Sequence, residues 1–513
     1  MNTDQVSAVD HLPTLAFRGT REAELFTREI AESFKAVLAK NYVSLETATM
    51  PAGFVSASVD GRPCTGTMWT RDCGTFGREL VQWGLIERAK QTMDCCIRLV
   101  GKNAEGFYCF PEQFEGKKKG TGEELDGTAA IIIAMVSLWQ RLPASDPMRA
   151  RLYDFLHGPA SPVKYLHTRV DKAPLLAGTG EFGSGMGAGG AQCNVVQNSL
   201  AMLALITAAR MEEAAGDKPA GEQYRAAAIQ LRDNMLKYLL DERGAWLWSV
   251  NPGTFKPDAN VNNAPSNIGA SLINGVASMY SDVLGLTPAE DEFWRPMVQP
   301  CLKTFDELLS RPLRKEQFEK YGIYIQFEQL CGGCLTSPSY GQGYAIQTLL
   351  LYDRLEQAAK ALAWLATCTY EPIPEFAPKL HRDSPYWFYE RTYSPMAVGR
   401  TPLEEGCGAL NLVCVSEPLK VARLIMGVDD TRGDEVRIVP RLPQGWTRAE
   451  ALDWPVWTGH TLRRANLLAE KTEKGLRIRL KVSDGRDPIP NVSVRLAPGQ
   501  WQSAQSVHDN TWE

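Results

Sequence analysis

The sequence lacks any apolar stretch long enough to cross a membrane. Its longest apolar run, Thr128–Trp139, falls well short of the ~20 residues that a membrane-spanning helix needs. The N-terminus also lacks the basic start and unbroken apolar core of a secretory signal, because acidic residues and a proline interrupt MNTDQVSAVDHLPTLAF. We therefore expect a cytoplasmic protein with no membrane partner.

An excess of basic charge is missing as well. The net charge is −5, and basic clusters such as Lys117–Lys119 are short. A nucleic-acid-binding surface needs basic residues gathered on one face. We expect no nucleic-acid partner, and the charge balance favours a neutral or small substrate.

Cysteine is sparse, with twelve residues in a chain of 513. Most occur inside apolar helical patterns, where cysteine acts as a small hydrophobic residue, namely Cys95, Cys96, Cys368 and Cys414. This distribution indicates a reducing compartment. Cys331 and Cys334 have the spacing of a zinc or redox pair, but a structural zinc site needs a second pair of ligands. None stands out, so we expect neither a metal nor a cofactor.

Two kinds of helical segment alternate from Arg21 to about Val428. One kind is charged along one side, which is typical of helices with one face in water: 21–40, 86–100, 221–240 and 353–368. The other kind is apolar nearly all round and must be covered on every side: 127–139, 195–209, 267–285, 343–352 and 406–415. A double ring of helical hairpins explains this alternation. A helical solenoid is the alternative, but it would repeat at a fixed period, and we find none.

The pattern changes to strands after about Asp430. Residues 434–446 alternate like a strand, and residues 461–482 are typical of two strands joined by a turn near Glu473. We therefore expect a mainly α protein, with an (α/α)6 toroid of helical hairpins over residues 1–428. A small β-sandwich-like domain should follow over residues 429–513.

The loops that lead into the buried helices are long and rich in glycine, aromatic and polar residues. Long connections in compact domains are often functional. At the N-terminal ends of helices, backbone N–H groups and the helix dipole also favour anionic side chains. We expect the active site on the face of the toroid where these loops open.

One such loop ends in MWTRDCG, residues 68–74, at the start of a helix. A sugar hydroxyl both donates and accepts hydrogen bonds, so a sugar site needs a multiple donor such as Arg71 beside an acceptor such as Asp72. Trp69 offers an apolar face for a pyranose ring. The alternative is an Arg–Asp pair that only caps the helix.

The segment MWTRDCG resembles the Trp-Thr-Arg-Asp signature of glucoamylase-type inverting glycoside hydrolases, and it is similar to the Met-Trp-Leu-Arg-Asp-Ser signature of exo-α-1,6-mannosidases. Both groups belong to the six-hairpin glycosidase superfamily, which has an (α/α)6 barrel. The resemblance implies that Arg71 and Asp72 hold the non-reducing-end sugar. A second segment, EELDGTAA, is similar to an Arg-Asp-Gly segment at the start of the fourth family helix. It implies a role for Asp126, with Glu124 one position before the family arginine.

Hydrolysis with inversion needs a protonated carboxyl for the leaving oxygen and a carboxylate that activates water, about 6.5–9.5 Å away. The loop that corresponds to the family acid contains one carboxylate, Glu181, whereas alignment onto the helix start places Gln192 at that position. The other candidate proton donors lie in the neighbouring loop: Glu123, Glu124 and Asp126.

Glu390 is the candidate base. It lies seventeen residues before CGALNL, close to the family spacing between the base and the last inner helix. Trp387 and Tyr389 would supply the partly apolar pocket that binds sugars. Glu404 and Glu405 are rivals, although a Glu-Glu pair just before a helix is typical of a cap.

The sequence therefore favours a glycoside hydrolase that acts on an oligosaccharide by single displacement, as a monomer or homodimer. One alternative uses the same barrel as an N-acylglucosamine 2-epimerase or a polysaccharide lyase, which rely on a histidine or tyrosine base. Only His157, His167 and His381 follow the first helix within the barrel, and the first two lie in an outer connection. A carbohydrate-binding protein that lacks the acid is the other alternative, and it would explain Gln192.

Overall fold

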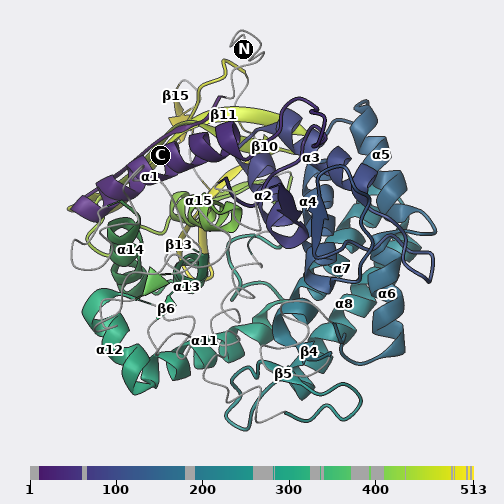
Figure 1. Cartoon of the computed structure of the whole chain (residues 1–513). Helices are drawn as coiled ribbons and strands as arrows, with labels where there is room; N and C mark the ends of the chain where they lie inside the picture. The colour runs from purple at the N-terminus through teal and green to yellow at the C-terminus, as the bar shows by residue number, and fades with distance from the viewer. Residues whose placement is uncertain are drawn as a thin grey trace.

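The computed structural model describes most of the chain and arranges its helices in two concentric rings (Figure 1). The described residues are 11–59, 66–178, 191–257, 281, 283–323, 335–336, 340–370, 392–393, 410–433, 435–486, 489, 491–503, 506–508 and 511–512.

The inner ring is built from the apolar helices. Its described members are α2 (Thr70–Gln82), α4 (Leu125–Arg141), α7 (Val195–Ala215), α13 (Tyr340–Leu351) and α15 (Leu412–Met426). Helix α4 packs on α2 and α7, and α15 packs on α13 and α2. Every residue from Leu125 to Trp139, and every residue of α15, is buried. Helices that are apolar all round are thus covered on all sides, as their composition predicts.

The outer ring consists of amphipathic helices: α1 (Arg21–Lys40), α3 (Ile86–Leu99), α5 (Pro147–His157), α6 (Pro162–Lys172), α8 (Lys218–Tyr238), α11 (Arg295–Ser310), α12 (Pro312–Tyr321) and α14 (Leu355–Tyr370). Helix α8 is representative, because it buries Tyr224, Leu231 and Met235 against α7 and turns its charged side outward. The prediction of a mainly α toroid with half-exposed outer helices and a C-terminal β-domain is confirmed.

A buried ion pair joins the last inner helix to the first. Arg423 of α15 donates from Nε and Nη2 to the two carboxylate oxygens of Glu79 in α2, each at 2.8 Å. Trp83 Nε1 donates to the same carboxylate at 3.3 Å. The carboxylate is fully buried, and the pair fastens the two ends of the helical ring together.

Helix α15 begins later than its apolar pattern predicts. The pattern indicated a helix over residues 406–415, but the helix begins at Leu412 and extends to Met426. Asn411 sets this start, because its side chain accepts a hydrogen bond from Cys414 N, and side-chain caps of this kind fix helix N-termini. Leu410, just before, has a positive φ of 50°, which lies outside the right-handed helical region.

Two sheets follow the last helix. Their described strands are β8 (Val428–Asp429), β9 (Val436–Ile438), β10 (Arg448–Thr458), β11 (Thr461–Thr472), β12 (Gly475–Val482), β13 (Val492–Ala497), β14 (Gln500–Ser503), β15 (Ser506–His508) and β16 (Thr511–Trp512). One sheet has the order β1-β10-β11-β12-β16-β15, and the other has the order β14-β13-β9-β8. Strands β11 and β12 form the predicted hairpin, closed where Thr472 pairs with Gly475.

The N-terminal strand β1 (Thr14–Arg18) belongs to the C-terminal sheet, although the sequence analysis placed it in the helical domain. It pairs antiparallel with β10, with Thr14 opposite Leu452 and Arg18 opposite Arg448. Phe17 points into a fully buried cluster with Phe26 of α1 and with Trp446. Burial of this aromatic ring explains why a strand so far away in the sequence adds to the sheet.

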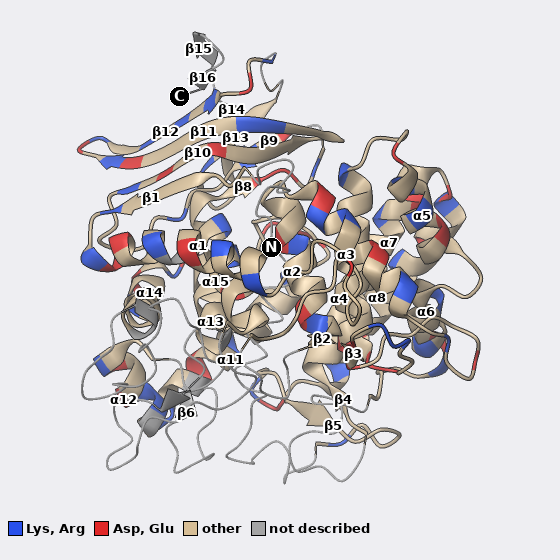
Figure 2. Ribbon diagram, turned by 45° about the horizontal axis from the view of Figure 1, so that its top comes forward, with Lys and Arg blue, Asp and Glu red and all other residues tan. Residues whose placement is uncertain are grey.

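The sheets and the short strands lie at opposite ends of the helical ring (Figure 2). The short strands form ribbons that lead into inner helices: β2 (Thr67–Trp69) with β3 (Gln113–Glu115), β4 (Cys193–Asn194) with β5 (Ser249–Val250), and β6 (Leu335–Thr336) with β7 (Thr392–Tyr393). At the other end, Arg141 in the last turn of α4 donates to Asp430 at 2.6 Å. The sheets therefore cover the C-terminal ends of inner helices and leave the N-terminal ends to the loops.

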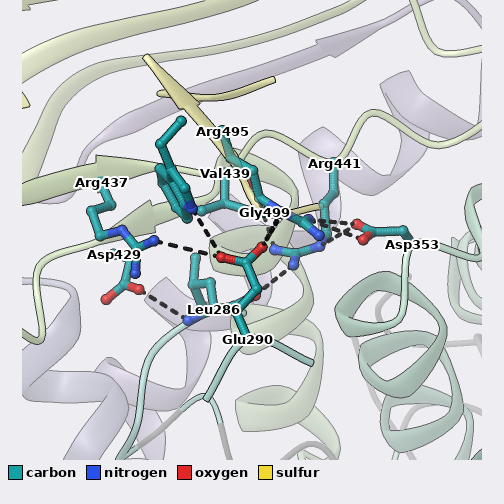
Figure 3. Close-up of polar contacts among 10 residues, drawn as sticks. Leu286, Glu290, Asp353, Asp429, Arg437, Val439, Arg441, Arg495 and Gly499 are labelled. Atoms are coloured by element: carbon teal, nitrogen blue, oxygen red, sulfur yellow. Dashed lines mark hydrogen bonds and ion pairs between the residues drawn. The ribbon is translucent and has the colours of Figure 1, made fainter. Parts of the chain in front are cut away.

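A charged cluster fixes the sheets to the helices (Figure 3). Arg495 of β13 bonds Glu290 at 3.0 Å and Asp353 at 2.9 Å, and both carboxylates belong to connections between helices. Glu290 also accepts from Gly499 N and Trp501 Nε1, each at 2.9 Å. One carboxylate thus receives donors from two C-terminal segments.

The cluster around Glu290 should make stability depend on pH. Burial opposes ionisation of Glu290, but the hydrogen bonds from Gly499 and Trp501 and the charge of Arg495 outweigh it and lower the pKa below the usual 4.5. A lowered pKa in the folded state contributes stability above the unfolded pKa, and this contribution is lost as the pH falls through the folded pKa. Between about pH 6 and pH 3.5, the melting temperature of the native chain should therefore fall more steeply than that of Glu290→Gln.

Calorimetric melting curves across this pH range measure the difference. The exposed Glu222 on α8 supplies the matched control, Glu222→Gln, which should follow the native chain. A Glu290→Gln curve parallel to that of the native chain would show that the cluster does not stabilise the fold through its charge.

No helix within the described ranges has the length and apolarity needed to span a bilayer. The structure describes the side chains of seven cysteines, all of them free and buried: Cys73, Cys95, Cys96, Cys109, Cys193, Cys301 and Cys414. Burial of Cys95, Cys96 and Cys414 agrees with their place in apolar patterns.

Candidate active site

The chain enters α2 from a short ribbon that holds the first helical turn in place. Strand β2 pairs with β3, and Trp69 stands opposite Gln113. Trp69 occupies the N-cap position of α2 and makes no side-chain cap. Instead, Thr70 N donates to Glu112 O at 3.0 Å. Trp69 gives α2 no side-chain cap, and the β2–β3 ribbon instead fixes where the helix begins.

Close packing brings the starts of α2 and α4 together. A Cβ atom on Gly74 would lie 2.5 Å from the backbone of Ala130, so only glycine permits this approach of the two helices. Gly127 lies equally close to Thr70, where a Cβ would meet Oγ1 at 2.1 Å. Asp126 in the first turn of α4 thus lies beside Arg71 in the first turn of α2.

Arg71 lies between two carboxylates. Its Nη1 donates to Asp126 Oδ2 at 3.0 Å, and its Nε is 3.7 Å from Asp72 Oδ1. The Asp126 side chain is fully buried, whereas Arg71 retains 11% exposure and Asp72 retains 8%. Both carboxylates occupy first helical turns, where the dipole favours anions. The arrangement combines a fixed cation and two acceptors at one point of the loop face.

Trp69 adds a donor to this group. Its indole Nε1 is buried, yet no acceptor for it occurs among the residues described in the structure. A buried indole N–H usually finds a hydrogen-bond partner. This N–H is therefore a donor that a ligand oxygen could satisfy.

Glu124 lies directly behind this group, at the N-cap position of α4. Its Oε2 is 3.3 Å from Thr70 Oγ1, and the same hydroxyl lies 2.7 Å from Pro111 O. A hydroxyl carries one hydrogen, and the shorter contact assigns it to the carbonyl. The contact of Thr70 with Glu124 Oε2 is therefore the weaker of the two.

Gln192 lies at the start of the next inner helix, in the ribbon before α7. Its Nε2 donates to Asn251 Oδ1 at 3.3 Å, and its backbone bridges to Gly178. Gln192 thus pairs with Gly178 across the base of the loop that carries Glu181. Its side chain also links this loop to the residue after the β4–β5 ribbon.

Sequence reasoning missed Gln197, which lies one turn into α7. Asn194 Oδ1 caps the helix by accepting from Gln197 N at 2.8 Å, and the Gln197 side chain is fully buried. Among the residues that the structure describes, neither polar atom of its amide has a hydrogen-bond partner. The signal in the sequence that could have identified Gln197 is its polar amide in the first turn of a mostly apolar helix.

The remaining predicted site residues, Glu181, Trp387, Tyr389 and Glu390, lie outside the described residues, as do the rivals Glu404 and Glu405. The same holds for His381, Cys331 and Cys334.

No family model and no curated protein matches this sequence. The structure, in contrast, is similar to solved glycosidases. It resembles a GH78 family rhamnosidase of Bacillus sp. GL1, with a TM-score of 0.57 and 14% identity over 94% of this chain and 42% of that chain. It also resembles a family 15 glucoamylase from Hypocrea jecorina, with a TM-score of 0.55 and 15% identity over 79% of this chain and 72% of that chain. The chain has the six-hairpin glycosidase fold.

This six-hairpin chain is shorter than the rhamnosidases that it resembles. An α-L-rhamnosidase from Dictyoglumus thermophilum matches with a TM-score of 0.54 and 13% identity over 95% of this chain and 46% of that chain. The chain therefore spans less than half of the length of either rhamnosidase. At these identities the likeness establishes the fold, and the chemistry follows from the residues of this chain.

Proposed function

We propose that this six-hairpin protein is a glycoside hydrolase that cleaves an oligosaccharide by inverting single displacement. The observation that supports this most is the Arg71 group at the N-terminal ends of α2 and α4. Arg71 presents several N–H donors, and Asp72 and Asp126 supply acceptors within 3.7 Å of it. Such a set matches the donor and acceptor pattern of vicinal sugar hydroxyls.

Trp69 completes the binding of the terminal sugar in this proposal. Its ring supplies the apolar face, and its unpartnered Nε1 supplies one further donor. Gln192 and Gln197 at the start of α7 would contact the next part of the substrate, and we propose that Trp387 and Tyr389 form an apolar pocket beside the base.

Two carboxyl groups divide the chemistry. Glu390 activates the water, and Glu181 protonates the leaving oxygen. Glu124 is the second candidate donor, because its buried carboxyl lies at the N-cap position of α4, within one turn of Asp126 in the Arg71 group. Asp126 is unsuited to this role, since its close pairing with Arg71 favours the charged form.

The epimerase and lyase alternatives need a histidine or tyrosine base at the loop face. Within the described ranges, His157 and His167 lie on the outer helices α5 and α6, away from the start of α2. In either of these reactions, His381 would be the histidine that acts as the base.

Binding and turnover must be measured together to test the proposal. A panel of α-linked glucosides, rhamnosides and mannosides is titrated calorimetrically and assayed in parallel for new reducing ends. A hydrolase releases reducing sugar from at least one member of the panel. Heat without any product would identify a carbohydrate-binding protein, in line with Gln192 at the position of the family acid.

Asp72→Ala should weaken binding of the ground state and the transition state together. Loss of one hydrogen bond to a charged group costs about 1.5–3 kcal/mol, so kcat/KM should fall by about 10–100-fold, mostly through a higher KM. Asp94→Ala on the outer helix α3 is the matched control, because Asp94 pairs with the surface residues Arg98 and Arg151. Steady-state kinetics measure both constants. An unchanged KM for Asp72→Ala would show that Asp72 does not bind the sugar.

A comparison of two substrates with different leaving groups identifies the proton donor. A nitrophenolate departs without protonation, so loss of the acid should be nearly silent on a nitrophenyl glycoside and lower kcat by about 10²–10⁴-fold on the natural linkage. Glu181→Gln should show this contrast. If Glu123→Gln or Glu124→Gln shows it instead, that residue is the acid; if none of the three variants does, the two-carboxyl mechanism fails.

A further inference from the structure

Three metal-ligand side chains meet far from the sugar site. His157 ends α5, Glu212 lies near the end of α7, and Asp217 caps α8. One ligating atom from each lies within 4.8 Å of those of the other two. In the described part of the chain, this is the one such group of three His, Cys, Asp or Glu side chains.

Glu212 is the centre of the group. Its side chain has no solvent exposure, and both of its carboxylate oxygens lie 3.1 Å from His157 Nδ1. Burying a carboxylate is costly unless a cation or several donors compensate its charge. A divalent cation between Glu212, His157 and Asp217 would compensate it directly.

Tyr153 holds two of these side chains in position. Its hydroxyl donates to Glu212 Oε2 at 3.0 Å, and its ring stacks on the His157 ring with centroids 5.0 Å apart. Metal sites typically have such outer partners, which orient the ligands.

Asp217 is fixed as well. Its Oδ1 accepts from Ala220 N at 3.1 Å, as the cap of α8, and its own N–H donates to Glu212 O at 2.9 Å. One oxygen of Asp217 thus stays with the helix while the other remains available for a ligand. The His157 side chain is 39% exposed, which gives an ion a path to the group from solvent.

From this geometry we infer a binding site for a divalent transition metal, such as Zn²⁺, formed by His157 Nδ1 and the carboxylates of Glu212 and Asp217. Imidazole and carboxylate ligands suit zinc and its neighbours better than magnesium or calcium. Ligands about 2.1 Å from a tetrahedral ion lie about 3.4 Å from one another, close to the 3.1 Å between His157 and Glu212. The three ligands leave one position for water.

The ion would have a structural role. Glu212 follows the start of α7 by 17 residues, or roughly 26 Å along the helix, so the site is remote from the N-terminal face. The ligands come from α5, α7 and the α7–α8 turn. A bound ion would therefore fasten an outer helix to an inner helical hairpin.

Titration of the full chain with Co²⁺ after treatment with a chelator tests the site. We expect about one equivalent to bind with a visible absorption band free of thiolate contribution, and the melting temperature to rise by about 2 °C or more. Absence of binding would overturn the inference, and so would a thiolate band, because that would assign the metal to the cysteines.

Two variants locate the ion. His157→Phe keeps the stack on Tyr153 without the ligand nitrogen, and Asp217→Asn keeps the helix cap without the charge. Each should weaken Co²⁺ binding by more than about 10-fold. Loss of a residue that only orients a metal ligand already weakens metal binding by about 10-fold. His167→Phe is the matched control, because His167 is not one of the three ligands: it pairs with Asp171 on α6 and packs edge-on against Tyr224. Equal weakening by His167→Phe, or none by the other two variants, would refute the assignment.

Discussion

Glu390→Gln is expected to lower kcat by about 10²–10⁴-fold with little change in KM. Glutamine keeps the shape of the side chain and a hydrogen bond, but it cannot take a proton from water. The effect should therefore fall on the chemical step and leave sugar binding intact. Steady-state kinetics on the best oligosaccharide of the panel measure both constants.

Glu404→Gln provides the comparison for this variant, because Glu404 is the rival carboxylate in the same loop. If Glu404 acts as a helix cap, its replacement should leave kcat within about threefold of the native value, as the loss of a surface cap costs about 1 kcal/mol of stability and no chemistry. A silent Glu390→Gln together with an inactive Glu404→Gln would move the base to Glu404.

Arg423→Met should be the most destabilising single change at the closure of the helical ring. Burial opposes ionisation of Glu79, but the charge and hydrogen bonds of Arg423, together with the charges of Arg78 and Lys420, outweigh it and hold the pKa of Glu79 below its usual value. Removal of the arginine leaves a fully buried carboxylate without its main partner, which typically costs 3–5 kcal/mol, so the free energy of unfolding should fall by about that amount. Urea denaturation followed by circular dichroism measures the loss.

The paired controls separate charge from packing. Arg98→Met breaks the partly exposed Arg98–Asp94 pair on α3 and should cost about 1 kcal/mol or less. The double variant Glu79→Leu with Arg423→Met removes both charges and should recover much of the lost stability. A loss below about 1 kcal/mol for Arg423→Met would show that the pair does not hold the ring closed.

The sequence predicted the helical ring because inner and outer helices differ in their local pattern of apolar and charged residues. The expected helix over residues 21–40 agrees with α1, and the apolar run from residue 195 agrees with the start of α7. A helix that is apolar all round must be buried on every side, and an amphipathic helix must be buried on one side. The burial of each helix therefore follows from its composition. The shape of the barrel was therefore accessible without any homologous structure.

Contacts between distant segments were not accessible in the same way. The sequence placed Arg71 beside Asp72, but neighbouring residues on a helix point in different directions. The closer partner of Arg71 is Asp126, which lies 55 residues later on the next inner helix. The approach depends on Gly74 and Gly127, whose role becomes visible only when α2 and α4 are packed together.

Strand β1 and the group around Glu212 were missed for the same reason. A five-residue strand has a weak alternation, and its partner β10 begins at Arg448. His157, Glu212 and Asp217 have no short spacing that would mark a metal motif, since they come from three helical segments. Local patterns predict elements well, while sites assembled from several elements need the tertiary structure.

The stereochemistry of the first sugar released tests the central claim most directly. Proton magnetic resonance follows the anomeric signals while the native chain cleaves the best oligosaccharide of the panel. We predict a new reducing end whose anomeric configuration is opposite to that of the cleaved bond, and that the signal is absent with Glu390→Gln. Retention of configuration would contradict single displacement, and the absence of any reducing end across the panel would contradict hydrolysis itself.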